Sequence, residues 1–281
     1  MISTVGIGMP VYNGEKTIKR AIDSLRRQSY KNFKLIISDN ASTDQTESIC
    51  REYEKIDSRI SYIKQSSNIG IGNNFKYVLN NSHEEYFMWA AADDCWSSNF
   101  LLFNLENLER VKGIIASISK SKYCSLYDIN PGDHAILNKG IYARRMNYLQ
   151  NPGINSRLYS IFRRSILEKI DIDKYMFIGA DWALIYDLLE YGGFYRDDRE
   201  VGFFKSENGL SRDKASIKLQ ARDRCIGYLI PLHRLTHHII VNGGIIYLPL
   251  IIKHNIVYLL YSYPLVHKFL RYLKYSFKNG L

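Results

Sequence analysis

The chain has 281 residues, of which 46% are apolar and 23% charged, and its formal net charge is +10 with a sequence pI of about 9.3. These values exclude an intrinsically disordered protein and predict one large domain or two closely packed halves. The basic balance indicates phosphate-bearing partners, such as nucleotides, nucleic acid or an anionic membrane surface.

The positive charge is concentrated toward the C-terminal end. Residues 226–281 contain no Asp or Glu and carry six Lys or Arg residues, which supplies +6 of the net +10. The four cysteines are far apart in the sequence and form no Cys-x-x-Cys pair, so we expect reduced cysteines in a cytoplasmic protein and no zinc site. The first residues lack the basic start and apolar run of a secretory signal.

Strand and helix patterns alternate along roughly the first hundred residues. Short apolar runs predict buried strands, and helix-length segments separate them, the second opened by Ser42-x-x-Gln45, which resembles a capping box. This alternation predicts parallel βαβ units. The expected strands are Val5–Val11, Phe33–Ile37, Ile60–Ile63 and Tyr86–Ala90, and a later strand and helix are expected at Ser156–Phe162 and Trp182–Glu190.

Polar residues follow each of the first four expected strands. In open parallel sheets ligands bind beyond the carboxyl ends of the strands, so we expect these residues at one rim. Their convergence is stronger evidence for a site than any single motif. They are Tyr12-Asn13, Asp39-Asn40, the Gly- and Asn-rich loop Asn68–Asn74, and Asp93-Asp94.

The Asp93-Asp94 pair indicates a cation site. Adjacent carboxylates raise each other's pKa unless a cation is present, and Mg²⁺ or Mn²⁺ typically shares such oxygens with substrate phosphates. The alternative is a solvated acidic turn. Asp39 can accept an N–H from a nucleobase or form an Asx turn before the Ser42 helix. Backbone N–H groups of the loop at Asn68, Gly70 and Asn73 can approach a phosphate.

Taken in order, these segments resemble the N-terminal half of the inverting family 2 glycosyltransferases, which have the GT-A fold. The resemblance covers roughly the first 100 residues well and extends loosely to about Ser211. It implies an α/β fold with a Rossmann-like, mostly parallel sheet flanked by helices. The matching strings are Pro10-Val11-Tyr12-Asn13-Gly14-Glu15, Ile36-Ile37-Ser38-Asp39-Asn40-Ala41-Ser42-Thr43-Asp44, Asn68-Ile69-Gly70 and Ala92-Asp93-Asp94.

The resemblance also implies roles for the matched residues. Asp39 would contact the base, usually uracil in this family, and Asp93 would face the ribose or diphosphate. Asp94 would bind a divalent metal, Mn²⁺ or Mg²⁺. Position 92 is Ala, so a full Asp-x-Asp motif is absent and the metal coordination stays open. The residues expected to line the nucleotide pocket are Pro10, Tyr12 and Glu15.

Asp181 is the expected general base. Gly179-Ala180-Asp181-Trp182 resembles the family's acidic segment at a helix start, and an inverting displacement needs a group that takes the acceptor hydroxyl proton. The alternative role for Asp181 is a helix-start carboxylate favoured by the dipole. Two softer resemblances are Arg157–Arg164, a strand after the acceptor loop, and Lys205–Ser211, a loop that closes over donor phosphates. A Gln-x-x-Arg-Trp motif of processive relatives is absent, which favours transfer of a single sugar.

Two other function classes stay open. A sugar nucleotidyltransferase would carry a Gly-rich, Arg- and Lys-containing phosphate loop after the first strand, where this chain has Val11–Glu15. A non-catalytic nucleotide-sugar- or glycan-binding protein is compatible with the missing first Asp. A nucleic-acid partner is not expected, because the basic tail is apolar.

Three segments are expected: residues 1–110 as the nucleotide-sugar half, 111–225 as the acceptor half of the same domain, and 226–281 as an apolar, basic helical extension.

Leu235–Ile252 has 18 residues without Asp, Glu, Lys or Arg, near the lower limit for a membrane span, but it contains Gly243-Gly244 and Pro249. After Pro264, apolar and basic residues separate onto two helical faces, which predicts an interfacial helix. The expected location is cytoplasmic, peripheral on the inner face of the cell membrane, near a glycan or lipid-linked acceptor. The alternative is a helix pair that packs on the core.

Overall fold

The computed structural model describes residues 3–123, 134–153, 156–175, 177, 179–206 and 232–262. The chain divides into two compact units, each of which is described by itself. The first unit comprises Met1–Met176 and Leu184–Glu207, and the second comprises Phe177–Ala183 and Asn208–Leu281.

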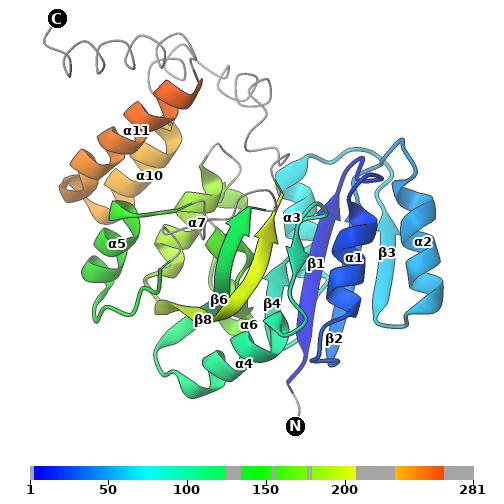
Figure 1. Cartoon of the computed structure of the whole chain (residues 1–281). Coiled ribbons are helices and arrows are strands. Elements are labelled where there is room, and N and C mark those ends of the chain that lie inside the picture. The colour runs from blue at the N-terminus through cyan, green and yellow to red at the C-terminus, as the bar shows by residue number, and fades with distance from the viewer. Residues whose placement is uncertain are drawn as a thin grey trace, which may run out of the picture. The chain divides into compact units, whose positions relative to one another are not determined.

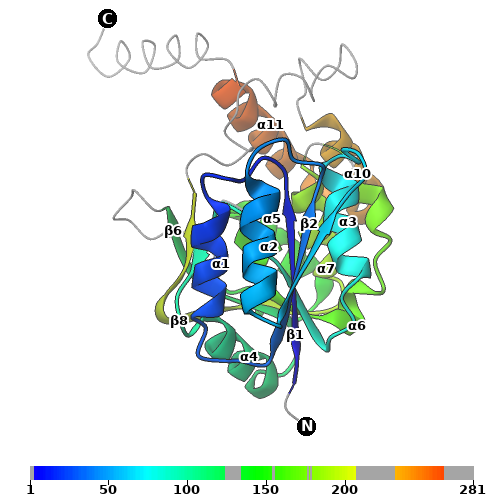
Figure 2. The same ribbon diagram turned by 90° about the vertical axis from the view of Figure 1, so that its right-hand side faces the viewer.

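The first half of the sheet is parallel, as the sequence predicts. Its four strands lie in the order β3-β2-β1-β4, and every neighbouring pair is parallel. Right-handed crossovers place α1 and α2 on one face and α3 on the other, because the chain reverses direction across the sheet after β3 (Figures 1 and 2). The strands are β1 (Val5–Val11), β2 (Phe33–Asp39), β3 (Ile60–Lys64) and β4 (Tyr86–Trp89), and the helices are α1 (Ile18–Arg26), α2 (Thr46–Ile56) and α3 (Ile71–Asn80).

The second half of the sheet is mixed, which corrects the expectation of a mostly parallel sheet. It continues in the order β7-β6-β8-β5 beyond β4. The β6–β8 pair is parallel, whereas β7 pairs antiparallel with both β4 and β6, and β5 pairs antiparallel with β8. These strands are β5 (Cys95–Trp96), β6 (Ile114–Tyr123), β7 (Ile161–Arg163) and β8 (Gly193–Lys205).

The expected strand at Ser156–Phe162 is only partly present. Ser156–Tyr159 forms a 3₁₀ turn, and β7 begins at Ile161. The helix predicted at Trp182–Glu190 is confirmed as α7, although it begins earlier, at Ala180. The remaining helices of this region are α4 (Phe100–Arg110), α5 (Ile141–Gln150), α6 (Arg164–Leu167), a 3₁₀ turn at Ile172–Tyr175 and α7 (Ala180–Leu188).

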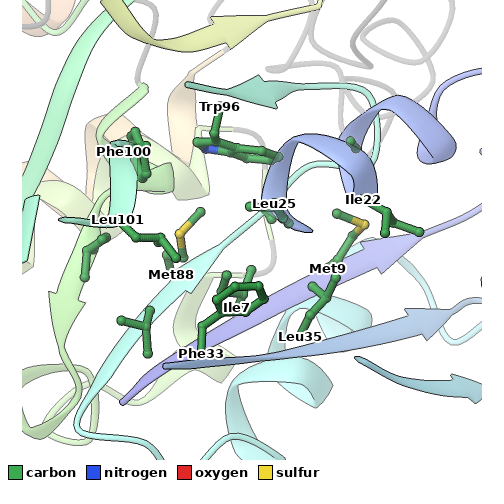
Figure 3. Close-up of a cluster of buried hydrophobic side chains, with 14 of the residues drawn as sticks. Ile7, Met9, Ile22, Leu25, Phe33, Leu35, Met88, Trp96, Phe100 and Leu101 are labelled. Atoms are coloured by element: carbon green, nitrogen blue, oxygen red, sulfur yellow. The ribbon is translucent and has the colours of Figure 1, made fainter. Parts of the chain in front are cut away.

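Buried apolar side chains cover both faces of the parallel half. On one face, side chains of β1, β2 and β4 meet those of α1 and α4, and Figure 3 shows Ile7, Met88 and Leu25 in this cluster. On the other face, Trp89 packs edge-on against Phe87 and Phe162. Burial on both faces is typical of parallel strands, and it explains why these strands are recognisable as short continuous apolar runs.

The second unit contains two helices joined by a sharp turn. They are α10 (His233–Gly243) and α11 (Leu248–Ser262), with a 3₁₀ turn at Ile245–Tyr247 between them. Gly244 has φ of 88°, a left-handed conformation that ends α10 and divides the uncharged run Leu235–Ile252. Across the described ranges, no helix has the length and apolarity that a membrane crossing requires. The interfacial helix expected after Pro264 lies outside the described residues.

Candidate functional site at the ends of the parallel strands

The loops after β1 and β2 are joined by hydrogen bonds in both directions. Asn13 has φ of 51°, and this left-handed residue turns the chain so that successive N–H groups point toward the loop after β2. Side-chain oxygens of one loop accept backbone N–H groups of the other, so each loop fixes the other's conformation. The bonds run from Asn13 N to Ser42 Oγ (2.8 Å), Gly14 N to Thr46 Oγ1 (2.8 Å), Glu15 N to Asp44 Oδ2 (3.0 Å), Thr43 N to Asn13 Oδ1 (2.9 Å) and Gln45 N to Glu15 Oε2 (3.1 Å).

This arrangement corrects the expected capping box. Ser42 Oγ accepts from Asn13 rather than from the following helix, and α2 begins at Thr46. Asp44, the residue before the N-cap Gln45, accepts from Thr46 N at 3.0 Å at the start of that helix. Although burial raises the pKa of Asp44, hydrogen bonds from Thr46 and from Glu15 N hold it below its ordinary value.

The loop after β3 is attached to the loop after β2 through Asn40. The Asn40 side chain donates to Asn68 Oδ1 at 2.9 Å and accepts from Ile69 N at 2.8 Å. Asn68 Oδ1 also accepts from Gly70 N at 2.9 Å. The predicted convergence of polar residues is therefore present at the ends of three strands.

Helix α3 begins earlier than expected, at Ile71, so Asn73 lies in its first turn and not in a loop. Gly70 precedes the helix with φ of 83°, a conformation that glycine adopts without steric cost. Asn73 is exposed and donates to Ile69 O at 2.8 Å. Asn68 and Gly70 are also exposed. A helix N-terminus reached through an exposed glycine is suited to an anionic group.

Asp39 is fully buried, and both of its carboxylate oxygens accept hydrogen bonds from within the chain. Oδ1 accepts from Ser42 N at 2.8 Å, which is the Asx-turn role, and Oδ2 accepts from Tyr62 Oη at 2.6 Å. Burial and the bond to Asp39 raise the pKa of Tyr62. From the sequence, Asp39 is expected to contact a base directly. In this conformation Asp39 has no accessible oxygen that could accept a hydrogen bond from a base.

The ring of Tyr12 is the exposed aromatic group at the end of β1, with 52% of its surface accessible. Pro10 and Glu15 are partly buried beside it. Glu15 contributes its carboxylate to the start of α2, as described above. Among the three residues expected to line a nucleotide pocket, Tyr12 has the surface available for stacking on a base.

Asp94 is buried with 2% of its surface accessible, and Ser206 N donates to its Oδ1 at 2.7 Å. This contact exists because β5 pairs with β8, matching Cys95 with Phe204. Burial, followed by the negative charge of Asp93, raises the pKa of Asp94 to about 7. A nearby positive charge would therefore favour the ionised form of Asp94.

Positive groups near the aspartates come from two elements. Arg20 of α1 donates to the carbonyl oxygen of Asp93 at 2.9 Å, and the charges of Lys205 and Arg20 act to lower the pKa of Asp94. Lys205 also lies over the ring of Tyr159, with its nitrogen 5.8 Å from the centroid. Residues 207–211 of the expected phosphate-covering loop lie outside the described residues.

Asp181 lies in the first turn of α7 and belongs to the second unit. Its Oδ1 accepts from Trp182 N at 3.0 Å, a local bond that fits the helix-start alternative. It is partly buried. In the same unit, Trp182 packs edge-on against His254 of α11.

Sequence reasoning missed Arg20, Tyr62 and Ser206. Arg20 is an ordinary exposed residue of a helix, and only the fold brings it to Asp93. Tyr62 is an ordinary residue of a strand, and only the fold brings it to Asp39. Ser206 contributes a backbone N–H, for which no side-chain signal exists. Within the described ranges, no group of three or more His, Cys, Asp or Glu residues is arranged to hold a metal ion by itself.

The sequence model of the family described as glycosyl transferase family 2 matches residues 7–171, more than half of the chain. The chain belongs to this family. The matched range includes most of β1, all of β2 to β4, and both Asp39 and Asp94. It ends before Asp181.

Curated relatives in the family include an uncharacterized glycosyltransferase of Rickettsia typhi, 33% identical over 133 residues, which are 45% of this chain and 41% of the relative. The putative teichuronic acid biosynthesis glycosyltransferase TuaG of Bacillus subtilis is 33% identical over 104 residues, which are 36% of this chain and 40% of the relative. The matches thus span less than half the length of these relatives.

Solved structures share the fold. TarS 1–349 of S. aureus aligns with a TM-score of 0.58 and 17% identity, covering 79% of this chain and 65% of that chain. A mannosyltransferase from Pyrobaculum calidifontis, in complex with GDP-Man and Mn²⁺, aligns with a TM-score of 0.52 and 16% identity, covering 97% of this chain and 80% of that chain. The α/β architecture inferred from the sequence is therefore confirmed.

Proposed function

We propose that the protein is an inverting glycosyltransferase that transfers a single sugar from a UDP-sugar to a glycan or lipid-linked acceptor in surface polysaccharide synthesis. The observation that carries this proposal is the position of Asp94. It is a buried carboxylate at the rim where the loops after β1, β2 and β3 are bonded together, and it lies beside Asp93 and within the range matched by the family model.

The donor side of the proposed site is assembled from the bonded loops. Tyr12 stacks on the base, and the N-terminus of α3 with Asn68, Gly70 and Asn73 faces the phosphates. Pro10 and Glu15 shape the loop that carries Tyr12. Asp39 acts by holding Ser42 and Tyr62 in place, and a direct bond from uracil requires the base N–H to replace the Tyr62 hydroxyl.

The donor set at Asp93-Asp94 fits a divalent cation, Mn²⁺ or Mg²⁺. Both residues offer hard oxygen atoms, and burial of Asp94 beside the partly buried Asp93 leaves negative charge that a cation balances. Asp94 would hold the metal, with Asp93 directed to the ribose or diphosphate. When bound, the metal stabilises negative charge on the departing diphosphate. P. calidifontis mannosyltransferase and a mycobacterial glucosyl-3-phosphoglycerate synthase were both solved with Mn²⁺, which supports this assignment.

Asp181 is proposed as the general base. The acceptor oxygen forms a bond to the anomeric carbon while the bond between that carbon and the diphosphate oxygen breaks. The acceptor hydroxyl proton passes to the Asp181 carboxylate. Support comes from the position of Asp181 in the first turn of a helix and from its resemblance to the family's acidic segment.

The surface-polysaccharide setting is supported by names among the relatives and fold neighbours. TuaG is described as a teichuronic acid biosynthesis glycosyltransferase, and TarS has been solved with UDP and with UDP-GlcNAc. A lipid-linked acceptor would place this protein at the cytoplasmic face of the cell membrane, as a peripheral protein.

The decisive experiment is incubation of the purified protein with Mn²⁺ and a panel of UDP- and GDP-sugars, followed by measurement of released nucleoside diphosphate. Release of UDP from one UDP-sugar supports the proposal. In a parallel incubation with a sugar phosphate and a nucleoside triphosphate, release of pyrophosphate indicates a nucleotidyltransferase instead. Tight donor binding in calorimetry without any release over long incubation indicates a non-catalytic binding protein.

A further inference from the structure

The turn between α10 and α11 presents a cluster of exposed aliphatic side chains. Ile245 and Ile246 are 73% and 54% accessible. Single exposed apolar residues are ordinary on protein surfaces, but a group this dense in sequence indicates an interaction surface. The cluster, here termed the isoleucine face, comprises Val241, Ile245, Ile246, Ile252, Ile256 and Val257.

The isoleucine face continues along one side of α11. Ile252 and Ile256 are four residues apart, so they lie one above the other on the helix, and the exposed Lys253 lies next to them. The opposite side of α11 is occupied. Ile251 is buried there, together with Asn255.

The buried side of α11 is bonded specifically to α10 through Asn255. Its Oδ1 accepts from Leu232 N at 2.9 Å, and its Nδ2 donates to Thr236 Oγ1 at 2.9 Å. A buried amide with these partners fixes the rotation of α11 about its axis, because turning the helix would leave buried polar groups unpaired. The apolar stripe is therefore held outward by the structure.

The chemistry of the segment identifies the partner. Residues 226–281 contain six Lys or Arg residues and no Asp or Glu, so the isoleucine face belongs to a segment of uniformly positive formal charge. Apolar side chains next to basic groups with no acidic group are suited to an anionic lipid surface, where the isoleucines enter the acyl boundary and the lysines meet headgroups.

We infer that the isoleucine face is the surface through which this protein lies on an anionic membrane, with Ile245 and Ile246 inserted at the turn. This inference rests on the peripheral membrane location within the proposed function and gives it a contact surface. That surface differs from the basic helix expected after Pro264. The inference does not depend on the identity of the donor or on the catalytic residues.

The test is flotation of the full chain with vesicles of equal parts phosphatidylglycerol and phosphatidylethanolamine, compared with pure phosphatidylcholine vesicles. Native protein is expected to float with the anionic vesicles and less with the neutral ones. The double variant Ile245→Ser, Ile246→Ser should lower the apparent affinity by about tenfold or more, because both side chains lose their burial in lipid. Ile252→Ser with Ile256→Ser should act in the same direction.

Ile56→Ser is the matched control, because Ile56 is an isoleucine of the first unit with 65% accessibility. It should float as native protein does. Ile246→Trp supplies a gain of signal that does not depend on loss of binding: its fluorescence should shift to shorter wavelength with anionic vesicles. Circular dichroism checks that each variant is folded.

Three results would overturn the inference. The first is that both double variants float as well as native protein does and that the fluorescence of Ile246→Trp does not shift with anionic vesicles. The second is loss of flotation only on deletion of residues 263–281. The third is a change from dimer to monomer in the double variants without a change in flotation, which would make a second copy the partner. Release of nucleoside diphosphate from the donor is measured in the same samples. If native protein floats with anionic vesicles but releases no nucleoside diphosphate, the proposed transfer reaction is refuted and the inference about the membrane surface stands.

Discussion

The two halves of the sheet have different interiors. In the half formed by β1 to β4, apolar side chains fill both faces. In the half formed by β6 and β8, the layer against α4 is polar: Ser117 Oγ donates to Asn104 Oδ1 at 2.7 Å, and Asn104 Nδ2 donates to Ser119 Oγ at 2.8 Å. Alongside them, Asn107 Nδ2 donates to Asp197 Oδ2 at 2.6 Å.

This difference separates two tasks in the proposed site. The apolar half ends in loops that bond to one another and present exposed groups to a donor. The polar half contributes little exposed chemistry, but Ser206, the residue after β8, holds Asp94 through its backbone N–H. A buried polar network with its partners satisfied specifies one arrangement of strands, which suits an element that orients a carboxylate.

The largest expected effect tests whether the fixed carboxylate is the metal ligand. Asp94→Ala should abolish sugar transfer, with a loss of at least about 10²–10³-fold, because the departing diphosphate loses its charge stabilisation. EDTA should do the same to native protein, and Mn²⁺ should restore activity to native protein only. Release of nucleoside diphosphate is the measurement.

Asp198→Ala is the control for that experiment, because Asp198 is a largely exposed carboxylate on β8 that pairs with Lys120 and Arg196. It should leave turnover unchanged. Full turnover of native protein in EDTA would remove the metal from the proposal.

The second expected effect concerns stability of the metal-free protein. The pKa of Asp94 is raised from an ordinary 3.8 to about 7, so the native state binds this proton more tightly than the unfolded state. The contribution of Asp94 to stability is therefore present below about pH 4 and is lost as pH rises toward 7, by roughly 4 kcal/mol at most.

The measurement is the free energy of unfolding by urea in EDTA at pH 5 and pH 8. Native protein should lose more stability between these values than Asp94→Asn, which has no proton to release. Mn²⁺ should recover native stability at pH 8 and not that of the variant. Equal pH dependence of the two proteins would show that Asp94 does not titrate in this range.

Sequence reasoning succeeds in the apolar half for a physical reason. Strands buried on both faces appear as short apolar runs, so β1 to β4 and their polar ends are recognisable without further information. In β6, the buried positions Ser117, Ser119 and Ser121 alternate with Ile118 and Lys120, and hydrophobic periodicity does not distinguish these serines from exposed ones. The sequence therefore predicts the polar rim at the ends of β1 to β3 and misses the strand order of the mixed half.

Contacts between distant segments set the other limit. The pattern at Ser42 and Gln45 fits a local helix cap, yet Ser42 bonds to Asn13, which lies 29 positions earlier. Asp39 is likewise recognised as a polar residue at a strand end, but its partner Tyr62 is 23 positions away. The local spacing of residues in the sequence identifies which residues belong to such a site, but it does not predict their hydrogen-bond partners.

The third effect tests the base outside the sheet. Asp181→Asn should lower the catalytic rate constant by roughly 10²-fold or more, because the acceptor hydroxyl keeps its proton. Donor affinity, measured by calorimetry with UDP-sugar, should stay close to native. Asp173→Asn, at an exposed aspartate that pairs with Lys76, is the control and should have no effect on either quantity. Weaker donor binding at an unchanged rate constant would identify Asp181 as structural.

The smallest expected effect concerns how the apolar half selects the nucleotide. If Asp39 acts by holding its loop, Asp39→Ala should weaken UDP binding by about tenfold, and Tyr62→Phe by a few-fold, because each removes one side of a buried hydrogen bond. Native protein should bind UDP more tightly than GDP. If uracil instead displaces the Tyr62 hydroxyl to reach Asp39, Tyr62→Phe should strengthen UDP binding, since no hydroxyl then competes for Oδ2.

Tyr53→Phe is the matched control, because Tyr53 Oη donates to Asp23 at 2.7 Å in an equivalent tyrosine–aspartate pair between α2 and α1. Equal affinity of native protein for UDP and GDP would dismiss both forms of the assignment, and the sign of the Tyr62→Phe effect decides between them.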